Sequence, residues 1–157
     1  MELRIKNNEK LFYYRAGAII IEEAHVLMVK NDSVDFFYSI GGAVNFGETS
    51  EDAVRREVLE ETGVAYEIDR LVFVYENILY EDGKENAHGI EFIYLMKPRG
   101  RRDGLSCTSY GWYGDKESLH WLPIDELENI KLFPEFFKTR LNDLPLGVER
   151  IVRKGFE

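Results

Sequence analysis

Residues 42–64, with the sequence GAVNFGETSEDAVRREVLEETGV, constrain the fold more than any other segment of the chain. They predict a helix from Thr49 to Thr62, because Thr49 or Ser50 can cap its first turn and Gly63 suits the turn that ends it. Glycines on both sides of the helix allow the backbone to turn sharply before and after it. The segment therefore predicts a loop, a charged helix and a second loop.

Glu57, Glu60 and Glu61 share one face of this predicted helix. A helix advances about 100° per residue, so the three carboxylates lie beside the apolar stripe that contains Val54. Like charges three or four residues apart destabilise a helix by about 0.2–0.5 kcal/mol per pair. Two interpretations fit these residues alone: a solvated acidic face in which Arg56 pairs with Glu60, or a site for a divalent cation.

Composition restricts the metals and partners of the chain. With one cysteine, Cys107, and three histidines, the chain has neither an internal disulfide nor a thiolate-rich zinc site, so oxygen atoms would hold any metal. The net charge of −9 argues against duplex nucleic acid and anionic membranes as main partners. The one basic cluster, residues 97–102, is typical of a solvated loop, with a phosphate-binding patch as the alternative.

The rest of the chain predicts one cytoplasmic domain, residues 1–157, around a mixed, largely antiparallel sheet. No apolar run reaches eighteen residues, and the charged start does not resemble a signal peptide. Short helices are expected near Asp125–Glu128 and from Pro134 to Leu141, and residues 144–157 fit either a tail or a strand. The β-rich segments are residues 16–21, 25–30, 36–40, 71–80 and 90–97, with hairpin or loop connections at 22–24, 31–33 and 81–87.

The spacing of glycines and charged residues in the first segment favours the metal site. It reads Gly42, five residues, Glu48, seven residues, Arg56-Glu57-Val58, one residue, Glu60-Glu61, one residue, Gly63-Val64. This pattern resembles the complete signature of the Nudix (MutT-like) hydrolases. The segments YYRAGAIIIEEAHVLMVK and HWLPIDEL also resemble the family's first strands and its late strand–helix connection. The resemblance implies an α/β/α sandwich, and one departure is Ile40, where the family often has a proline.

The resemblance also implies a reaction and a set of residues that perform it. The reaction would be metal-dependent hydrolysis of a nucleoside diphosphate linked to another group X, a small-molecule substrate, with Mg²⁺ or Mn²⁺ as cofactor. The implied roles are metal ligands for Glu57 and Glu61, a further ligand or the water-activating base for Glu60, orientation of a glutamate for Arg56, support of the site for Glu48, and the entry turn for Gly42.

Four features outside the signature are further candidates, and three of them have a structural alternative. Glu91 lies on an otherwise apolar strand face and is either a last carboxylate of the site or an exposed residue at a strand end. Tyr80 lies where the dinucleoside-polyphosphate branch of the family tends to have a tyrosine. Residues 36–38 either stack on a base or belong to the core. Arg15 contacts a phosphate or, as we expect, pairs with an acidic neighbour.

Two other classes of function compete with hydrolysis. A Nudix-type sensor domain would bind a nucleotide without turnover, but such a domain is expected to lose a metal carboxylate, and this chain keeps all three. An isomerase of the same fold would need a catalytic cysteine early in the sheet, whereas Cys107 lies in a late loop. The sequence does not name the base, the group X or the oligomeric state, for which a homodimer is one option.

Overall fold

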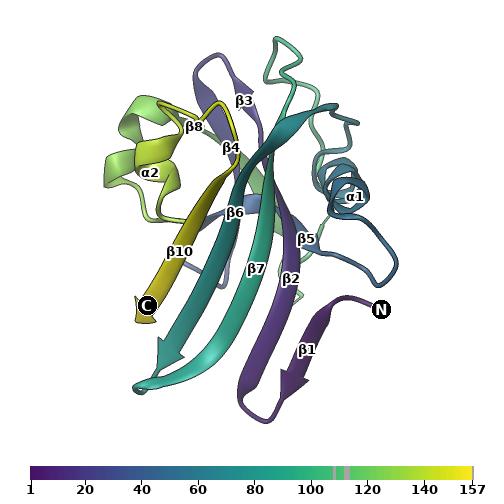
Figure 1. The fold of residues 1–157 in the computed structure, drawn as a ribbon. Coiled ribbons are helices and arrows are strands. Elements are labelled where there is room, and N and C mark those ends of the chain that lie inside the picture. The colour runs from purple at the N-terminus through teal and green to yellow at the C-terminus, as the bar shows by residue number, and fades with distance from the viewer. Residues whose placement is uncertain (108, 112–113, 157) are drawn as a thin grey trace.

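The protein is described by a computed structural model that covers residues 1–107, 109–111 and 114–156. A twisted mixed sheet lies between helix α1 (Ser50–Thr62) on one side and helix α2 (Phe137–Arg140) with the 3-10 helix η1 (Ile124–Asn129) on the other (Figure 1). This arrangement confirms the predicted α/β/α sandwich. The strands are β1 Arg4–Asn7, β2 Lys10–Ile19, β3 Ile21–Glu22, β4 His25–Asn31, β5 Phe37–Ala43, β6 Ile68–Glu81, β7 Lys84–Met96, β8 Glu117–Pro123, β9 Leu132–Phe133 and β10 Glu149–Phe156.

The strands form one sheet in which most neighbouring pairs are antiparallel. Its main path runs β10-β6-β7-β2-β5-β4-β3, and β1, β8 and β9 pair with β2, β4 and β5. The parallel pairs are β10 with β6, β2 with β7, and β5 with β9. Strand β2 therefore joins the long β6–β7 hairpin to strand β5, which leads toward α1.

Several strands are longer than the sequence predicted. Strands β6 and β7 meet at a tight turn in which Asp82 and Gly83 have φ values of 50° and 74°, and such a two-residue turn suits an Asp-Gly pair. The connection expected at residues 81–87 is a hairpin turn that is shorter than predicted, because residues 84–87 belong to β7. Strand β1 was missed because its residues are all exposed and carry no apolar alternation. Residues 149–156 form a strand, which resolves the alternative at the end of the chain.

The helices follow the predicted positions with two corrections. Helix α1 begins after Thr49, whose side chain accepts a hydrogen bond from the backbone N–H of Asp52 at 3.1 Å, and Gly63 ends it with a φ of 73°. The second helix is a 3-10 helix. The third was expected from Pro134, but residues 134–136 turn first and α2 begins at Phe137. Within the described part of the chain, no helix is long and apolar enough to cross a membrane.

Two hydrophobic clusters fix the helices on opposite faces of the sheet. On one face, Ala53, Val54 and Val58 of α1 are fully buried in a cluster with β2 and β5 residues such as Ala16. On the other face, Phe137 of α2 is fully buried in a cluster that includes strand residues. Burial of each large apolar side chain stabilises the fold by about 1.5–3 kcal/mol. The packing of α1 therefore fixes where its acidic face lies relative to β5.

Candidate active site

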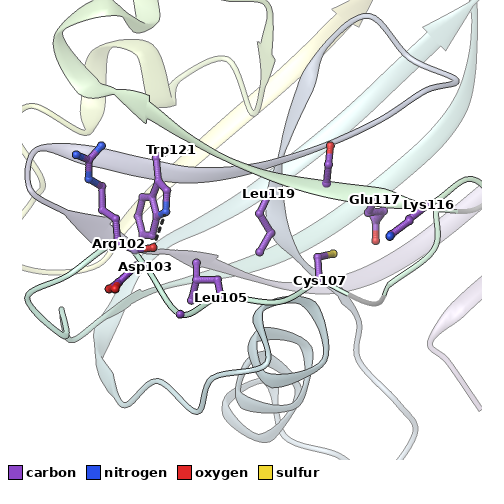
Figure 2. A pocket seen from close by; sticks show the side chains of 10 residues that line it. Arg102, Asp103, Leu105, Cys107, Lys116, Glu117, Leu119 and Trp121 are labelled. Atoms are coloured by element: carbon purple, nitrogen blue, oxygen red, sulfur yellow. Dashed lines mark hydrogen bonds between the residues drawn. The ribbon is translucent and has the colours of Figure 1, made fainter.

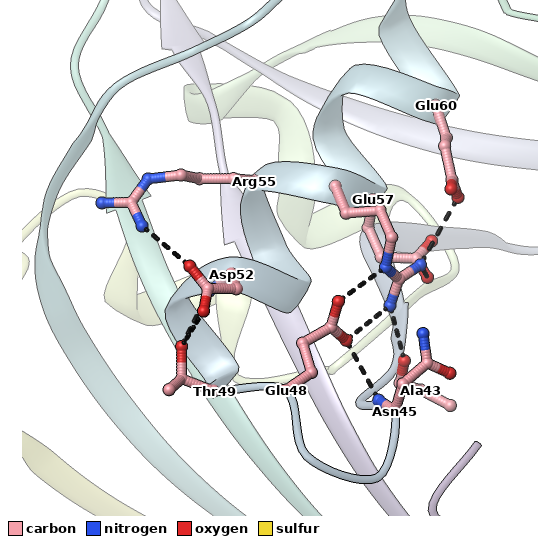
Figure 3. A network of polar contacts seen from close by, with 9 residues as sticks. Ala43, Asn45, Glu48, Thr49, Asp52, Arg55, Glu57 and Glu60 are labelled. Atoms are coloured by element: carbon pink, nitrogen blue, oxygen red, sulfur yellow. Dashed lines mark hydrogen bonds and ion pairs between the residues drawn. The ribbon is translucent and has the colours of Figure 1, made fainter. Parts of the chain in front are cut away.

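Arg56 connects the acidic helix to the loop before it, and Figure 3 shows its partners Glu48 and Glu57 close together between the loop and the helix. Its Nε and Nη2 atoms donate to the two carboxylate oxygens of Glu48, both at 2.9 Å, and Nη2 also donates to the carbonyl of Ala43 at 3.1 Å. Its Nη1 atom donates to Glu57 at 2.6 Å. The Arg56 hydrogen bonds lower the pKa of Glu48, which itself accepts the N–H of Asn45. The structure thus places Arg56 between Glu48 and Glu57.

The backbone at Gly41 and Gly42 lies next to two carboxylates of helix α1. A Cβ atom at Gly42 would overlap the carboxylate of Glu57, so a residue with a side chain would displace that carboxylate. The N–H of Gly41 donates to Oε2 of Glu61 at 2.9 Å. Gly41 has a φ of 142°, and a Cβ there would overlap the backbone of Ala16. Glu57 and Glu61 therefore lie against the same loop.

The three signature glutamates differ in exposure. Glu61 is 5% exposed, and its burial raises its pKa well above the ordinary range, an effect that Arg15 and the Gly41 N–H oppose. Burial also raises the pKa of Glu57, opposed by Arg56. The side chain of Glu60 is more than half exposed and lies 3.5 Å from Arg56. A bound cation would favour the ionised form of the two buried carboxylates.

The carboxylates are not gathered into a preformed metal site. Among the described residues, no three His, Cys, Asp or Glu side chains form a group that could hold a metal ion as they stand. Glu57 is engaged by Arg56 and Glu61 by the Gly41 N–H. Their oxygen atoms are nevertheless the ligands that Mg²⁺ prefers. The residues therefore fit such a cation by their chemistry, and the cation would compete with Arg56 for Glu57.

Glu117 is a fourth carboxylate at this site, and the sequence interpretation missed it. It is 7% exposed at the start of β8 and accepts a hydrogen bond from the hydroxyl of Tyr38. It lies close enough to Glu61 to contribute to the raised pKa of that residue. A signal was present, because Glu117 shares the strand alternation of Leu119 and Trp121 and so belongs to an otherwise apolar face.

A cavity of about 410 Å³ adjoins Glu117, between residues 102–107 and strand β8 (Figure 2). Leu105, Leu119 and Trp121 give it apolar walls, and Cys107 lies near its Glu117 end. The indole Nε1 of Trp121 donates to the carbonyl of residue 102 at 3.0 Å, which fixes the ring against the loop. The volume of the cavity falls in the range of small-molecule binding sites.

The basic cluster of residues 97–102 is anchored by Glu22. This carboxylate is 1% exposed and accepts the backbone N–H groups of Arg99 and Gly100, both at 2.9 Å, and the hydroxyl of Tyr66 at 3.1 Å. The side chain of Arg99 donates to Tyr66 and to the carbonyl of Asp103. The cluster is therefore a fixed loop that forms part of the cavity wall.

Glu91 and Arg15 form a buried ion pair. Glu91 lies in the middle of β7 and is 6% exposed, which corrects the expectation of a strand end. It pairs with Arg15, directly opposite on β2, and Arg15 also donates to the carbonyl of Ser39 at 2.7 Å. The expectation that Arg15 pairs with an acidic neighbour is confirmed. The charge of Arg15 lowers the pKa of both Glu57 and Glu61, which indicates that the ion pair lies close to the site.

The aromatic candidates lie in different places. Tyr80 lies one residue before the end of β6, and the amino group of Lys154 is 6.0 Å from its ring centroid. It is at the hairpin tip, and the structure does not bring it to the carboxylates. Phe36 packs edge-on against Phe133, with 5.0 Å between ring centroids. Tyr38 is the member of residues 36–38 that reaches the site, through Glu117.

Comparisons with known proteins show what this chain is similar to in sequence and in fold. The family model described as "NUDIX domain" matches residues 12–141. A "MutT-like protein" of Streptomyces ambofaciens is 30% identical over 139 residues, which are 88% of this chain and 79% of the relative. A "Putative 8-oxo-dGTP diphosphatase" of Bacillus subtilis (strain 168) is 36% identical over 139 residues, 87% and 88% of the two chains. The crystal structure of a MutT protein from Bacillus halodurans covers 90% of both chains with a TM-score of 0.69 at 19% identity, which shows a shared fold.

Proposed function

The chain belongs to the Nudix family of hydrolases, which act on phosphoric anhydride bonds, and we propose that it cleaves the diphosphate linkage of a nucleoside diphosphate joined to another group X. The products would be a nucleotide and a phosphorylated X. The observation that carries this proposal is the placement of Glu57 and Glu61 against the glycine loop, with Glu117 near enough for its charge to raise the pKa of Glu61. The name of the Bacillus subtilis relative, a diphosphatase of a nucleotide, supports a small-molecule substrate.

Nudix hydrolases generally need a divalent metal, and we propose Mg²⁺ or Mn²⁺ here. Glu57 and Glu61 would hold it, with Glu117 as a carboxylate from outside the helix. When bound, the cation would neutralise charge on the diphosphate and polarise a phosphoryl oxygen. Glu60 is a further ligand or the general base, and its exposure leaves it accessible to water.

The chain's own residues would position the reacting groups. Arg56 holds Glu48 and Glu57 in place, and the Gly41 N–H orients Glu61. In the reaction, a water oxygen would form a bond to phosphorus while the bridging P–O bond breaks. If Glu60 is the base, it takes the proton of that water, and the leaving phosphate takes the electrons of the broken bond.

A substrate panel tests the proposal. It contains nucleoside triphosphates, dinucleoside polyphosphates, ADP-ribose and nucleotide sugars, each with Mg²⁺, Mn²⁺ or a chelator. We expect metal-dependent turnover that falls by orders of magnitude in Glu57→Gln and Glu61→Gln, whereas Glu51→Gln, an exposed residue in the first turn of α1, leaves it unchanged. Undiminished activity in the Glu57→Gln/Glu61→Gln double variant would refute the proposed site. Binding of a nucleotide without turnover of any substrate would favour the sensor domain instead.

Three properties remain predictions from the sequence. They are a single domain over residues 1–157, a cytoplasmic location and an oligomeric state that includes the homodimer as an option. Because the net charge is −9, we still expect that duplex nucleic acid is not a partner. Size-exclusion chromatography with light scattering would determine the oligomeric state.

A further inference from the structure

Strands β1, β2, β7, β6 and β10 carry an apolar surface on the side of the sheet that holds α1. Ala16 of β2 packs in the cluster beneath α1, and Phe12, four residues before it on the same strand, faces the same side. These strands continue past α1 in the lower half of Figure 1. Beyond α1, three rows of the pairing register carry the apolar residues that we call the open face, which are Ile5, Phe12, Val74, Ile78, Ile90 and Val152.

The open face is not covered by the helices. None of its six residues belongs to the clusters that the described residues form beneath α1 and α2. Ile5, Phe12 and Val152 are 56%, 40% and 50% exposed, and the other three are half-buried between their neighbours. The opposite side of the same strands carries polar residues that are buried, such as Tyr75 and Glu91. A sheet face in contact with water is commonly polar, so the open face has the composition of a contact surface.

The surface of the whole chain is larger than that of a compact monomer of the same mass. Its accessible area is 8947 Å², whereas a monomeric protein of 18.3 kDa exposes about 8,100 Å². The difference of about 800 Å² equals the area that one partner buries in a standard protein–protein interface. Monomeric proteins rarely expose contiguous apolar patches larger than a few hundred Å². The chain therefore has enough surplus surface for one such interface, and the open face supplies its apolar part.

Charge favours a second copy of this chain as the partner. The chain has a net charge of −9, so two copies repel each other over most of their surface. The charged side chains in the three rows of the open face are Glu76, Arg150 and Lys154, which give a local formal charge of +1. Arg150 already pairs with Glu76 on the adjacent strand. Two copies can therefore meet through this face without the repulsion that the rest of the chain would impose.

We propose that two copies of this chain pack through their open faces and form a two-fold symmetric dimer. A two-fold contact uses the same surface of both partners, so each copy covers the apolar rows of the other. Burial of these rows supplies the free energy of association, since it removes apolar surface from water. The inference goes beyond the proposed function, because the contact involves neither the metal nor the substrate.

The test measures the mass of the protein in solution by size-exclusion chromatography with light scattering. Interfaces of standard size have dissociation constants from micromolar to picomolar, so the wild type should have the mass of two chains at about 10 and 100 μM. The dimer should persist in about 1 M NaCl, where the Debye length is only about 3 Å, because apolar burial and not charge holds it together.

Two variants place a charge in the open face. Phe12→Arg and Val152→Arg should each reduce the mass to that of one chain, because a charge buried in an apolar contact is unfavourable. Both side chains are at least 40% exposed in the single chain, so the variants should fold, which circular dichroism checks. Leu59→Arg is the matched control. Leu59 is 50% exposed, as Val152 is, but it lies on α1, so this variant should keep the mass of two chains.

Several results would overturn the inference. They are a wild-type mass other than that of two chains at about 100 μM, dissociation in high salt, and equal dissociation of Leu59→Arg. Dissociation of Val152→Arg but not of Phe12→Arg would also overturn it. That result would indicate pairing along the edge of β10, which ends the sheet, whereas Phe12 lies on β2 between β1 and β7. If Phe12→Arg does not fold, Phe12→Thr removes the ring with a residue that suits strands, and it should raise the dissociation constant of the dimer.

Discussion

Metal binding to the acidic face of α1 should be visible as thermal stabilisation. A cation that binds only the folded protein stabilises it by RT ln(1 + [metal]/Kd), about 2.7 kcal/mol at a hundred times the Kd. For a chain of this length, 1 kcal/mol shifts Tm by about 2–4 °C. Saturating Mg²⁺ or Mn²⁺ should therefore raise Tm by about 5–11 °C relative to protein in chelator, as measured by differential scanning calorimetry.

Glu57→Gln should remove most of this rise, because it replaces a charged ligand by a neutral one. The substitution should not destabilise the metal-free protein. Burial raises the pKa of Glu57 despite the Arg56 hydrogen bond, so ionisation of Glu57 costs more free energy in the folded than in the unfolded protein, and a neutral side chain avoids that cost. Glu51→Gln, on the same helix but exposed and away from the glycine loop, is the control and should keep the full rise.

Two results would contradict this reasoning. The first is a metal-induced rise of undiminished size in Glu57→Gln, which would place the cation elsewhere. The second is no shift of the wild-type melt with any divalent cation, even in the presence of a substrate analogue. In the second case the acidic face would be a solvated surface.

Three further outcomes follow from buried polar groups. Arg15→Met should destabilise the protein by about 3–5 kcal/mol in urea denaturation because it leaves Glu91 buried without its partner. Adding Glu91→Leu should recover most of this loss, and equal stability of the single and double variants would contradict the ion pair. Glu22→Ala leaves two backbone N–H groups of the 97–102 loop without their acceptor, at about 1–3 kcal/mol each, so an unchanged urea midpoint would show that the loop is anchored otherwise. Burial raises the pKa of the Cys107 thiol, so alkylation at pH 8 should be slower in native protein than in urea, and equal rates would refute the burial.

The sequence predicted the local features of this fold better than the long-range ones. The limits of α1 were correct because Thr49 and Gly63 cap it through their own chemistry. The β6–β7 hairpin was placed but shortened, since the polar residues after Gly83 hide a strand that is stabilised by pairing and not by apolar alternation. Both results depend on residues that are neighbours in the chain.

The candidate site was predicted where it depends on the signature and missed where it depends on the fold. The spacing from Gly42 to Gly63 identified the glutamates that lie against the loop. Glu91 was assigned as a strand-end carboxylate because its partner Arg15 is 76 residues away. Glu117 was missed for the same reason, since only the pairing of β8 with β4 brings it toward Glu61.

The parallel pairings of β2 with β7 and of β10 with β6 also have a consequence for folding kinetics. A β-hairpin forms within about 1–10 μs, whereas contacts such as Arg15 with Glu91 require closure of a long loop and form much later. We therefore expect β6 and β7 to pair first and to expose two free edges until β2 and β10 arrive. Free strand edges pair with other chains, so the yield of refolded protein should fall as the protein concentration during refolding rises.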